Sequence, residues 1–316
     1  MQQQHQQHKQ NKQQSQQYIQ DHIQETVNDS KLKIQEVHLR PEVLEIEHEL
    51  ITMRRHFHMH PETAYEEIET AGYIVQKLKE LKNIEIIEKV GKTGVVGVLR
   101  GGKNSGKGKC IMLRADMDAL NLKENTGEEF SSKYSGKHHA CGHDGHMAML
   151  LGAAQILSKW QNKIEGDIKF CFQPAEEGYA GAKAMIQDEK YPVLQNPKVD
   201  EAYGIHLFNS KYYPHVSAQT GPMTANSDFC EIKIIGTGSS AYMPHYSQDA
   251  VYISSQLINS LYGITSRNID PVSHQSISIG TINGGTAANI IASECSLKIS
   301  VRTTTEKQRK IQRSYK

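Results

Sequence analysis

The sequence predicts an α/β fold with a mostly parallel sheet, followed by a smaller α+β domain. The first observation is a set of short, compact apolar runs, as expected of strands that are buried on both faces. These runs occupy residues 94–99, 110–115, 168–173 and 202–207. The second observation is a helical spacing of apolar residues before and between the runs, at residues 41–58, 63–81, 145–160 and 181–188. Strands that alternate with helices are typical of a parallel sheet.

A change of pattern after Gly221-Pro222 predicts the second domain. Residues 228–235 alternate as a strand, 248–266 are helical, and 275–282 and 292–303 are further strands. This order is typical of a small α+β sandwich. We therefore expect one domain over residues 38–223 and another over 224–316.

The first 37 residues differ from the rest, because residues 1–20 are mostly glutamine and offer almost no apolar side chains to bury. Such a composition cannot offset the entropy lost on ordering, so we expect a disordered tail over residues 1–37. Two alternatives are a weak coiled-coil or self-association segment and an interaction arm.

Composition excludes several function classes. The chain has 36 Lys and Arg against 35 Asp and Glu, so no overall field attracts nucleic acid or an anionic membrane. No apolar run approaches the ~18 residues needed to cross a bilayer, and the N-terminus has no secretory core. The five cysteines are scattered and odd in number, which indicates reduced thiols and predicts a cytoplasmic location.

The segment 138–146 is the first candidate site, since it holds four histidines, a cysteine and an aspartate in nine residues. Cys141 and His143 lie two residues apart in a glycine-containing turn that leads into a helix. Thiolate and imidazole together suit zinc or another late first-row divalent ion. The alternative is a histidine-rich surface loop.

The second candidate is a pair of carboxylates, Glu176 and Glu177, directly after the apolar run 168–173. Taken alone, such carboxylates are often only solvated. Their position favours function, because sites of α/β proteins lie at the carboxyl ends of parallel strands. One glutamate can then bind a metal while its neighbour takes a proton from water.

Two further strand ends carry candidate residues. Asp116 and Asp118 follow the run 110–115, and His206 ends the last run. An aspartate beside a metal-binding histidine commonly orients the imidazole ring. Because these ends meet at one edge of a parallel sheet, the sequence predicts a metal-dependent hydrolase site there.

Six ordered motifs carry a resemblance to a known family. They are RRHFHMHPE (54–62), GKTGVVGVL (91–99), LRADMDAL (113–120), HACGHDGHMAMLLGAA (139–154), FQPAEEGYAGAKAMI (172–186) and YGIHL (203–207). The chain resembles, from about residue 45 to 303, the amidohydrolase family of indole-acetyl-amino-acid hydrolases, hippurate hydrolases and N-acyl-amino-acid deacylases. That family belongs to the clan of two-metal aminoacylases and carboxypeptidases.

The resemblance implies a zinc-peptidase-like catalytic domain with an inserted α+β lid domain that can mediate a homodimer. It implies two divalent ions, zinc or manganese, and a small N-acyl amino acid as substrate. The implied metal ligands are Cys141, His143, Glu177 and His206.

The resemblance also implies roles for four other residues. Glu176 would be the general base, and Asp116 would support catalysis from beside the metal ligands. Asn289 and Arg302, in the lid, match positions that contact the substrate, and an Arg fork suits a carboxylate.

Two departures from the family pattern keep an alternative open. Ser240 stands where the family has an oxyanion-stabilising histidine, and the family continues beyond the point where this sequence ends, with a final histidine ligand. Loss of one such oxyanion-stabilising group typically costs about 10²–10³ in turnover. The alternative is a catalytically degenerate or truncated relative that acts as a metal-binding or interaction protein.

Overall fold

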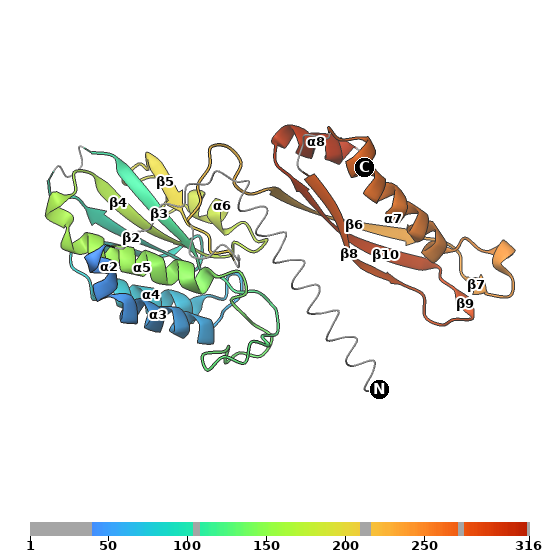
Figure 1. The fold of residues 1–316 in the computed structure, drawn as a ribbon, viewed down its shortest axis with the longest axis horizontal. Coiled ribbons are helices and arrows are strands. Elements are labelled where there is room, and N and C mark those ends of the chain that lie inside the picture. Colours follow the sequence, from blue (N-terminus) through green and yellow to red (C-terminus); the bar gives the residue numbers. More distant parts are fainter. Residues whose placement is uncertain (1–39, 104–107, 209–215, 271–274, 315–316) are drawn as a thin grey trace, which may run out of the picture. The chain divides into compact units, whose positions relative to one another are not determined.

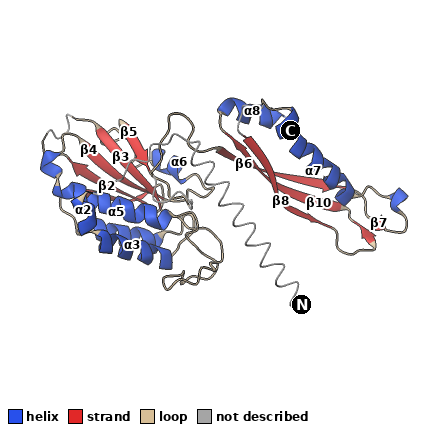
Figure 2. Cartoon of the chain, viewed as in Figure 1, coloured by secondary structure: helices blue, strands red, loops and turns tan. Residues whose placement is uncertain are grey.

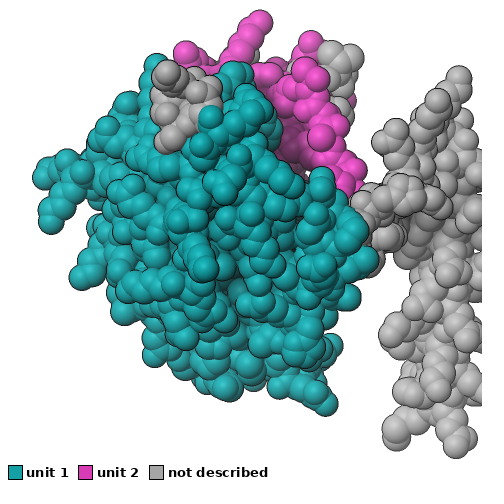
Figure 3. All heavy atoms as spheres, turned by 90° about the vertical axis from the view of Figure 1, so that its left-hand side faces the viewer, with its two compact units in different colours: residues 1–215 teal, residues 216–316 magenta. Residues whose placement is uncertain are grey.

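The computed structural model describes residues 40–103, 108–208, 216–270 and 275–314. The predicted tail over 1–37 lies outside these residues. The chain divides into two compact units, residues 1–215 and 216–316 (Figure 3), whereas the sequence predicts a domain boundary at 223/224. No helix of the described residues is both long and apolar enough to cross a membrane.

A five-stranded sheet forms the centre of unit 1, in the order β1-β2-β4-β3-β5 (Figure 1). Its strands are β1 (Ile84–Val90), β2 (Gly94–Arg100), β3 (Cys110–Asp116), β4 (Asp167–Gln173) and β5 (Glu201–Gly204). Strand β3 pairs in parallel with β4 and with β5, and β2 is antiparallel to β1 and to β4. Only β2 therefore runs against the others, and the prediction of a mostly parallel sheet is confirmed.

The strands differ from their predicted positions at the two sheet edges. Strand β1 was not predicted, because its sequence IEIIEKV mixes charged and apolar residues and only Val90 is buried. Strand β5 ends at Gly204 and is largely exposed, so it is not a strand buried on both faces. A single apolar run identifies central strands well and edge strands poorly.

Helices cover one face of the sheet and a smaller core covers the other (Figure 2). The helices of unit 1 are α2 (Pro41–Glu45), α3 (Glu47–Met59), α4 (Ile68–Lys79), α5 (His143–Lys159), the short η1 (Gln161–Lys163) and α6 (Gly181–Ile186). Val95 and Phe170 face the core of α3, α4 and α5, whereas their neighbours Val96 and Cys171 pack with Met185 of α6. This alternation is the period of two expected of strands.

Unit 2 is an antiparallel sheet with one long helix, as the predicted α+β domain requires. Its elements are β6 (Asn226–Ile235), β7 (Ser239–Ser240), η2 (Pro244–Tyr246), α7 (Ala250–Arg267), β8 (Gln275–Gly284), β9 (Ile290–Ile291), β10 (Glu294–Thr303) and α8 (Glu306–Ser314). Strand β10 lies between β6 and β8. Leu297 and Ile299 of β10 form its core with Leu257 and Leu261 of α7. Asp249 caps α7 by accepting hydrogen bonds from the N–H groups of Val251 and Tyr252 in the first turn.

A buried lysine ties the sheet to the chain after α6. Lys169 of β4 has no exposed surface, and its Nζ donates hydrogen bonds to the backbone carbonyls of Val193, at 2.8 Å, and Gln195. Burial lowers the pKa of Lys169. The ammonium group therefore holds a loop that packs against the second core.

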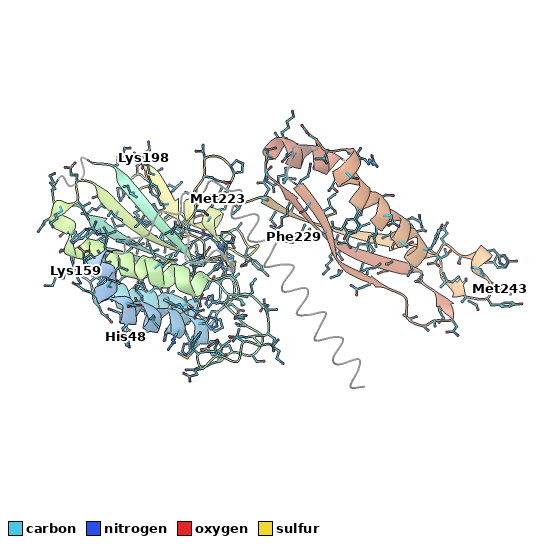
Figure 4. The ribbon with its side chains drawn as sticks, viewed as in Figure 1. His48, Lys159, Lys198, Met223, Phe229 and Met243 are labelled. Carbon is cyan, nitrogen blue, oxygen red and sulfur yellow. The ribbon has the colours of Figure 1, made fainter. Side chains whose placement is uncertain are left out.

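We predict that Lys169→Met destabilises unit 1, because the carbonyls of Val193 and Gln195 lose their donor while the side-chain volume is kept. The expected loss in the free energy of unfolding is roughly 2–4 kcal/mol. Thermal unfolding of this variant measures the loss. Lys198→Met is the matched control, since Lys198 is exposed (Figure 4). Equal melting temperatures for the two variants would contradict the role of Lys169.

Candidate metal centre

The ends of the parallel strands bring the predicted site residues to one edge of the sheet. Asp116 ends β3 opposite Gln173, the last residue of β4, three positions before Glu176. Strand β5 leads from Gly204 to His206, and α5 begins at His143. The predicted convergence of four segments therefore exists within unit 1.

His143 is the residue that the other candidate ligands share. One potential ligand atom of His143 lies within 4.8 Å of one from Cys141 and one from His206. A second group at the same spacing joins His143 with Glu176 and Glu177. The Cys141 Sγ and the His206 Nε2 are 3.5 Å apart. All four predicted metal ligands and the predicted base thus lie around one imidazole.

The His143 imidazole has one nitrogen in use and one free. Its Nδ1 lies 2.7 Å from the backbone carbonyl oxygen of Asp118, so Nδ1 carries the proton and donates it. Its Nε2 is buried and has no hydrogen-bond partner among the described residues. A buried nitrogen lone pair without a partner is costly unless a cation or water satisfies it. The residues therefore fit a metal ion on chemical grounds, with thiolate, imidazole and carboxylate donors that suit late first-row ions.

The charges of the site also favour a cation. Partial burial and then the neighbouring Glu177 raise the pKa of Glu176. Burial lowers the pKa of His143, but its contacts with Asp118, Cys141 and Asp116 outweigh burial and raise the pKa to about 11. The anions clustered around His143 thus favour a positive charge at this position. A divalent ion at Nε2 would supply that charge.

Asp118 positions His143, Glu176 and Glu177. From the sequence it is a candidate only because it is the second aspartate after the apolar run of β3. Its two carboxylate oxygens accept hydrogen bonds from the backbone N–H groups of Glu176 and Glu177, each at 2.9 Å. Its backbone carbonyl accepts the hydrogen bond from His143. Burial raises the pKa of Asp118, but the hydrogen bonds outweigh it and the net shift is downward.

Asp116 lies beside the predicted metal ligands and is linked to the segment with His206 through His146. The buried Asp116 carboxylate is 2.6 Å from the His146 Nδ1, and it forms an ion pair with Arg114 at 2.8 Å. The His146 Nε2 in turn accepts a hydrogen bond from the Leu207 N–H at 2.8 Å. This relay fixes the segment that carries His206. His146 belongs to the histidine-rich segment 138–146, but the sequence alone does not predict its role.

Glu67 is a positioning residue that sequence reasoning missed altogether. Its side chain is fully buried at the start of α4 and accepts hydrogen bonds from the Ala175 N–H and the Thr93 hydroxyl. Ala175 has a φ of 52° and Gly178 a φ of 93°, both in the left-handed region. Glu67 therefore stabilises the tight turn that presents Glu176. No spacing in the sequence connects a residue at position 67 with this turn.

Comparisons with known proteins agree with this geometry. Residues 112–301 match the family described as Peptidase family M20/M25/M40. Thermostable carboxypeptidase 1 of Saccharolobus solfataricus is 42% identical over 279 residues, which are 88% of this chain and 69% of the relative. The chain belongs to peptidase family M20/M25/M40.

Other M20 relatives support the same assignment. Hippurate hydrolase of Campylobacter jejuni is 41% identical over 87% of this chain and 70% of its own length. A putative aminohydrolase structure from methicillin-resistant Staphylococcus aureus has a TM-score of 0.74 and 32% identity, over 86% of this chain and 72% of that one. A Bacillus subtilis structure, described as a dinuclear metal binding peptidase, has a TM-score of 0.64 and 32% identity, over 84% and 67%.

M20 membership confirms the predicted family, fold class and enzyme class. The chain is a metal-dependent amidohydrolase with a zinc-peptidase-like fold, and two divalent metal ions are its cofactors. The individual roles of Cys141, His143, Glu176, Glu177 and His206 stay predictions that the geometry supports.

Unit 2 of this M20 chain contains three residues discussed in the sequence analysis, Ser240, Asn289 and Arg302. Arg302 is an exposed residue of β10 whose guanidinium lies 5.9 Å from the ring centre of Phe229. Asn289 accepts a hydrogen bond at its backbone carbonyl from the Ala241 N–H. Ser240 pairs with Ile290 in the two-stranded antiparallel sheet of β7 and β9. Substrate contact by Asn289 and Arg302 stays a prediction.

We predict that Asp118→Asn lowers kcat by about 10–100-fold, the usual cost of changing a residue that orients metal ligands. The amide nitrogen would face one of the two glutamate N–H groups and displace it. Initial rates on an N-acyl amino acid measure the effect. Asp188→Asn is the control, because Asp188 also accepts backbone hydrogen bonds, from Gly91 and Tyr191. Loss of activity in Asp188→Asn alone would contradict the role of Asp118.

Proposed function

We propose that this enzyme hydrolyses the amide bond of N-acyl amino acids. The observation that carries the proposal is the buried Nε2 of His143, which has no hydrogen-bond partner in the described part of the chain and is surrounded by a thiol, a second imidazole and two carboxylates. The names of the relatives support the substrate class. They include the Campylobacter jejuni hippurate hydrolase and an N-acyl-L-amino acid amidohydrolase of Geobacillus stearothermophilus, which is 38% identical.

The ligand set follows from the shared position of His143. Cys141, His143, Glu177 and His206 would hold the metal ions. The Glu177 Oε1 lies 3.9 Å from the His143 Nε2, which supports Glu177 rather than Glu176 as the ligand. When bound, the two divalent ions supply a Lewis acid for the amide carbonyl and lower the pKa of water.

Glu176 would move the protons of the reaction. Its side chain is more exposed than that of Glu177, so it can meet water and substrate at the open side of the site. Burial raises the pKa of Glu176 toward neutral pH. A carboxylate with such a pKa can both accept a proton and return it. Glu176 would take the proton from water and deliver it to the nitrogen of the departing amino acid.

The amino acid's carboxylate needs a cationic partner, and unit 2 offers one. Arg302 presents a planar guanidinium, which matches a carboxylate with two parallel hydrogen bonds. Asn289 would add an amide donor. Both assignments rest on their match to family positions and are part of the proposal.

We also propose a cytoplasmic location and a homodimer formed through unit 2. All five cysteines are free thiols, which supports a reducing compartment. The dimer rests on the resemblance alone. Size-exclusion chromatography with light scattering tests it directly.

We predict that Glu176→Gln lowers kcat at least about 10²-fold, because the amide cannot accept the proton. Metal content stays at the level of the unmodified chain, since Glu176 is not a ligand in this scheme. Release of glycine from N-benzoylglycine and elemental analysis measure the two quantities. Glu189→Gln, an exposed change nearby in the sequence, is the control and keeps full activity. Unchanged turnover in Glu176→Gln would refute the assigned base.

Metal removal gives an independent prediction. Treatment with a chelator abolishes hydrolysis, and added Zn²⁺ or Mn²⁺ restores it, because the ions activate both water and carbonyl. The inactive alternative, a metal-binding or interaction protein, predicts bound metal without hydrolysis of any N-acetyl or N-benzoyl amino acid. Turnover that remains after complete removal of metal would contradict the proposed metal-dependent hydrolysis.

A further inference from the structure

A second group of side chains with potential metal-ligand atoms lies in unit 1 and shares no residue with the centre described above. It consists of His58, Glu124 and His138, here called the His58 cluster. One ligand atom from each residue lies within 4.8 Å of the others. The His58 Nε2 is 3.1 Å from the Glu124 Oε1, and the His138 Nε2 is 3.9 Å from the same oxygen.

The cluster is enclosed, although two of its residues belong to a loop. The exposed fractions of the three side chains are 5% for His58, 6% for Glu124 and 13% for His138. His58 comes from α3, and His138 is fixed by two backbone hydrogen bonds with Leu120. A glutamate buried to this extent needs partners, and Glu124 contacts the His58 imidazole and two hydrogen-bond donors that fix its carboxylate.

Surrounding groups orient the donor atoms as they do around known metal ligands. The His58 Nδ1 lies 2.7 Å from the Asp144 Oδ2, and the Nε2 lies 3.1 Å from the Glu124 Oε1. The imidazole can donate at Nδ1, and a cation would insert between Nε2 and the Glu124 oxygen. A carboxylate behind a metal-binding histidine is a common arrangement. The Ser132 N–H and the Thr126 hydroxyl hold the carboxylate of Glu124.

Charge balance permits a divalent ion. Glu124 and Asp144 bring two negative charges, and Arg54 brings one positive charge that is already paired with Asp144 at 2.9 Å. The Arg54 guanidinium also lies 5.0 Å from the ring centre of Phe130. Arg54 is therefore occupied by partners other than Glu124.

We propose that His58, Glu124 and His138 form a zinc site separate from the hydrolytic centre. Two imidazoles and a carboxylate are a donor set that zinc accepts, with a fourth position left for water. Donor atoms around a tetrahedral zinc lie roughly 3.3–3.5 Å apart, from bonds of about 2.0–2.2 Å. The spacings in the cluster need only small side-chain movements to reach this geometry. The bound ion joins α3 to the segment that contains Glu124 and His138.

Metal content of the full chain tests the site. The chain is stripped with a chelator, equilibrated with buffered Zn²⁺ and analysed for bound zinc. Glu124→Gln and His138→Asn should each bind one zinc equivalent fewer than the unmodified chain. His48→Asn is the matched control, since His48 is an exposed histidine of the same helix α3 (Figure 4). It should lose none.

Two features keep the test decisive. The His138 imidazole makes no hydrogen bond among the described residues, so its replacement should not unfold the chain, which circular dichroism verifies. Co²⁺ separates the two sites, because only the centre with Cys141 gives a thiolate-to-cobalt absorption band. The Cys141→Ser variant should lose that band but still bind one metal equivalent at the His58 cluster. This result would show that the two sites bind metal independently. Equal zinc content in the unmodified chain, Glu124→Gln and His138→Asn overturns the proposal, whatever the hydrolytic centre does.

Discussion

The hydrogen bond from the His143 Nδ1 to the backbone carbonyl of Asp118 is the contact on which the site depends. It fixes the tautomer of the imidazole and leaves Nε2 as a bare lone pair inside the protein. The carboxylate of the same Asp118 holds the backbone of Glu176 and Glu177. One residue therefore sets the positions of a histidine donor and of both glutamates, and an error in its placement would displace all three together.

The rest of unit 1 makes that placement rigid. Asp118 follows β3, a central strand paired on both sides, whereas the segment with His206 follows the exposed edge strand β5. An edge strand restrains the following segment less than a central strand does. The hydrogen bonds between Asp116 and His146 and between His146 and Leu207 add restraint to the segment after β5. Glu67 does the same for the turn before Glu176. His143, Glu176, Glu177 and the segment with His206 are thus each held by a buried polar contact.

The sequence predicted the donors of the site but not most of the residues that hold them. Cys141, His143, Glu176, Glu177 and His206 could be found because metal chemistry requires those residue types and strand ends bring them together. The central strands were found for a similar reason, since full burial leaves an apolar run. Residues such as Glu67 and Asp118 accept hydrogen bonds from backbone N–H groups of distant segments. Because almost every residue has a backbone N–H group, the sequence does not show which segments they contact. Edge strands such as β1 escape because their exposed positions interrupt the apolar pattern.

The first turn of α5 shows why the histidine-rich segment is so dense. Successive residues of a helix point about 100° apart, so one turn can serve several neighbours. His143 points to the hydrolytic centre, Asp144 to His58, and His146 to Asp116. The turn before the helix needs a glycine, because Gly142 has a φ of 88°, a backbone conformation that other residues adopt with strain. A Cβ on Gly145 would lie 2.4 Å from the end of the Leu207 side chain, which would have to move aside. Gly142 is therefore a requirement of the backbone that leads into this crowded turn.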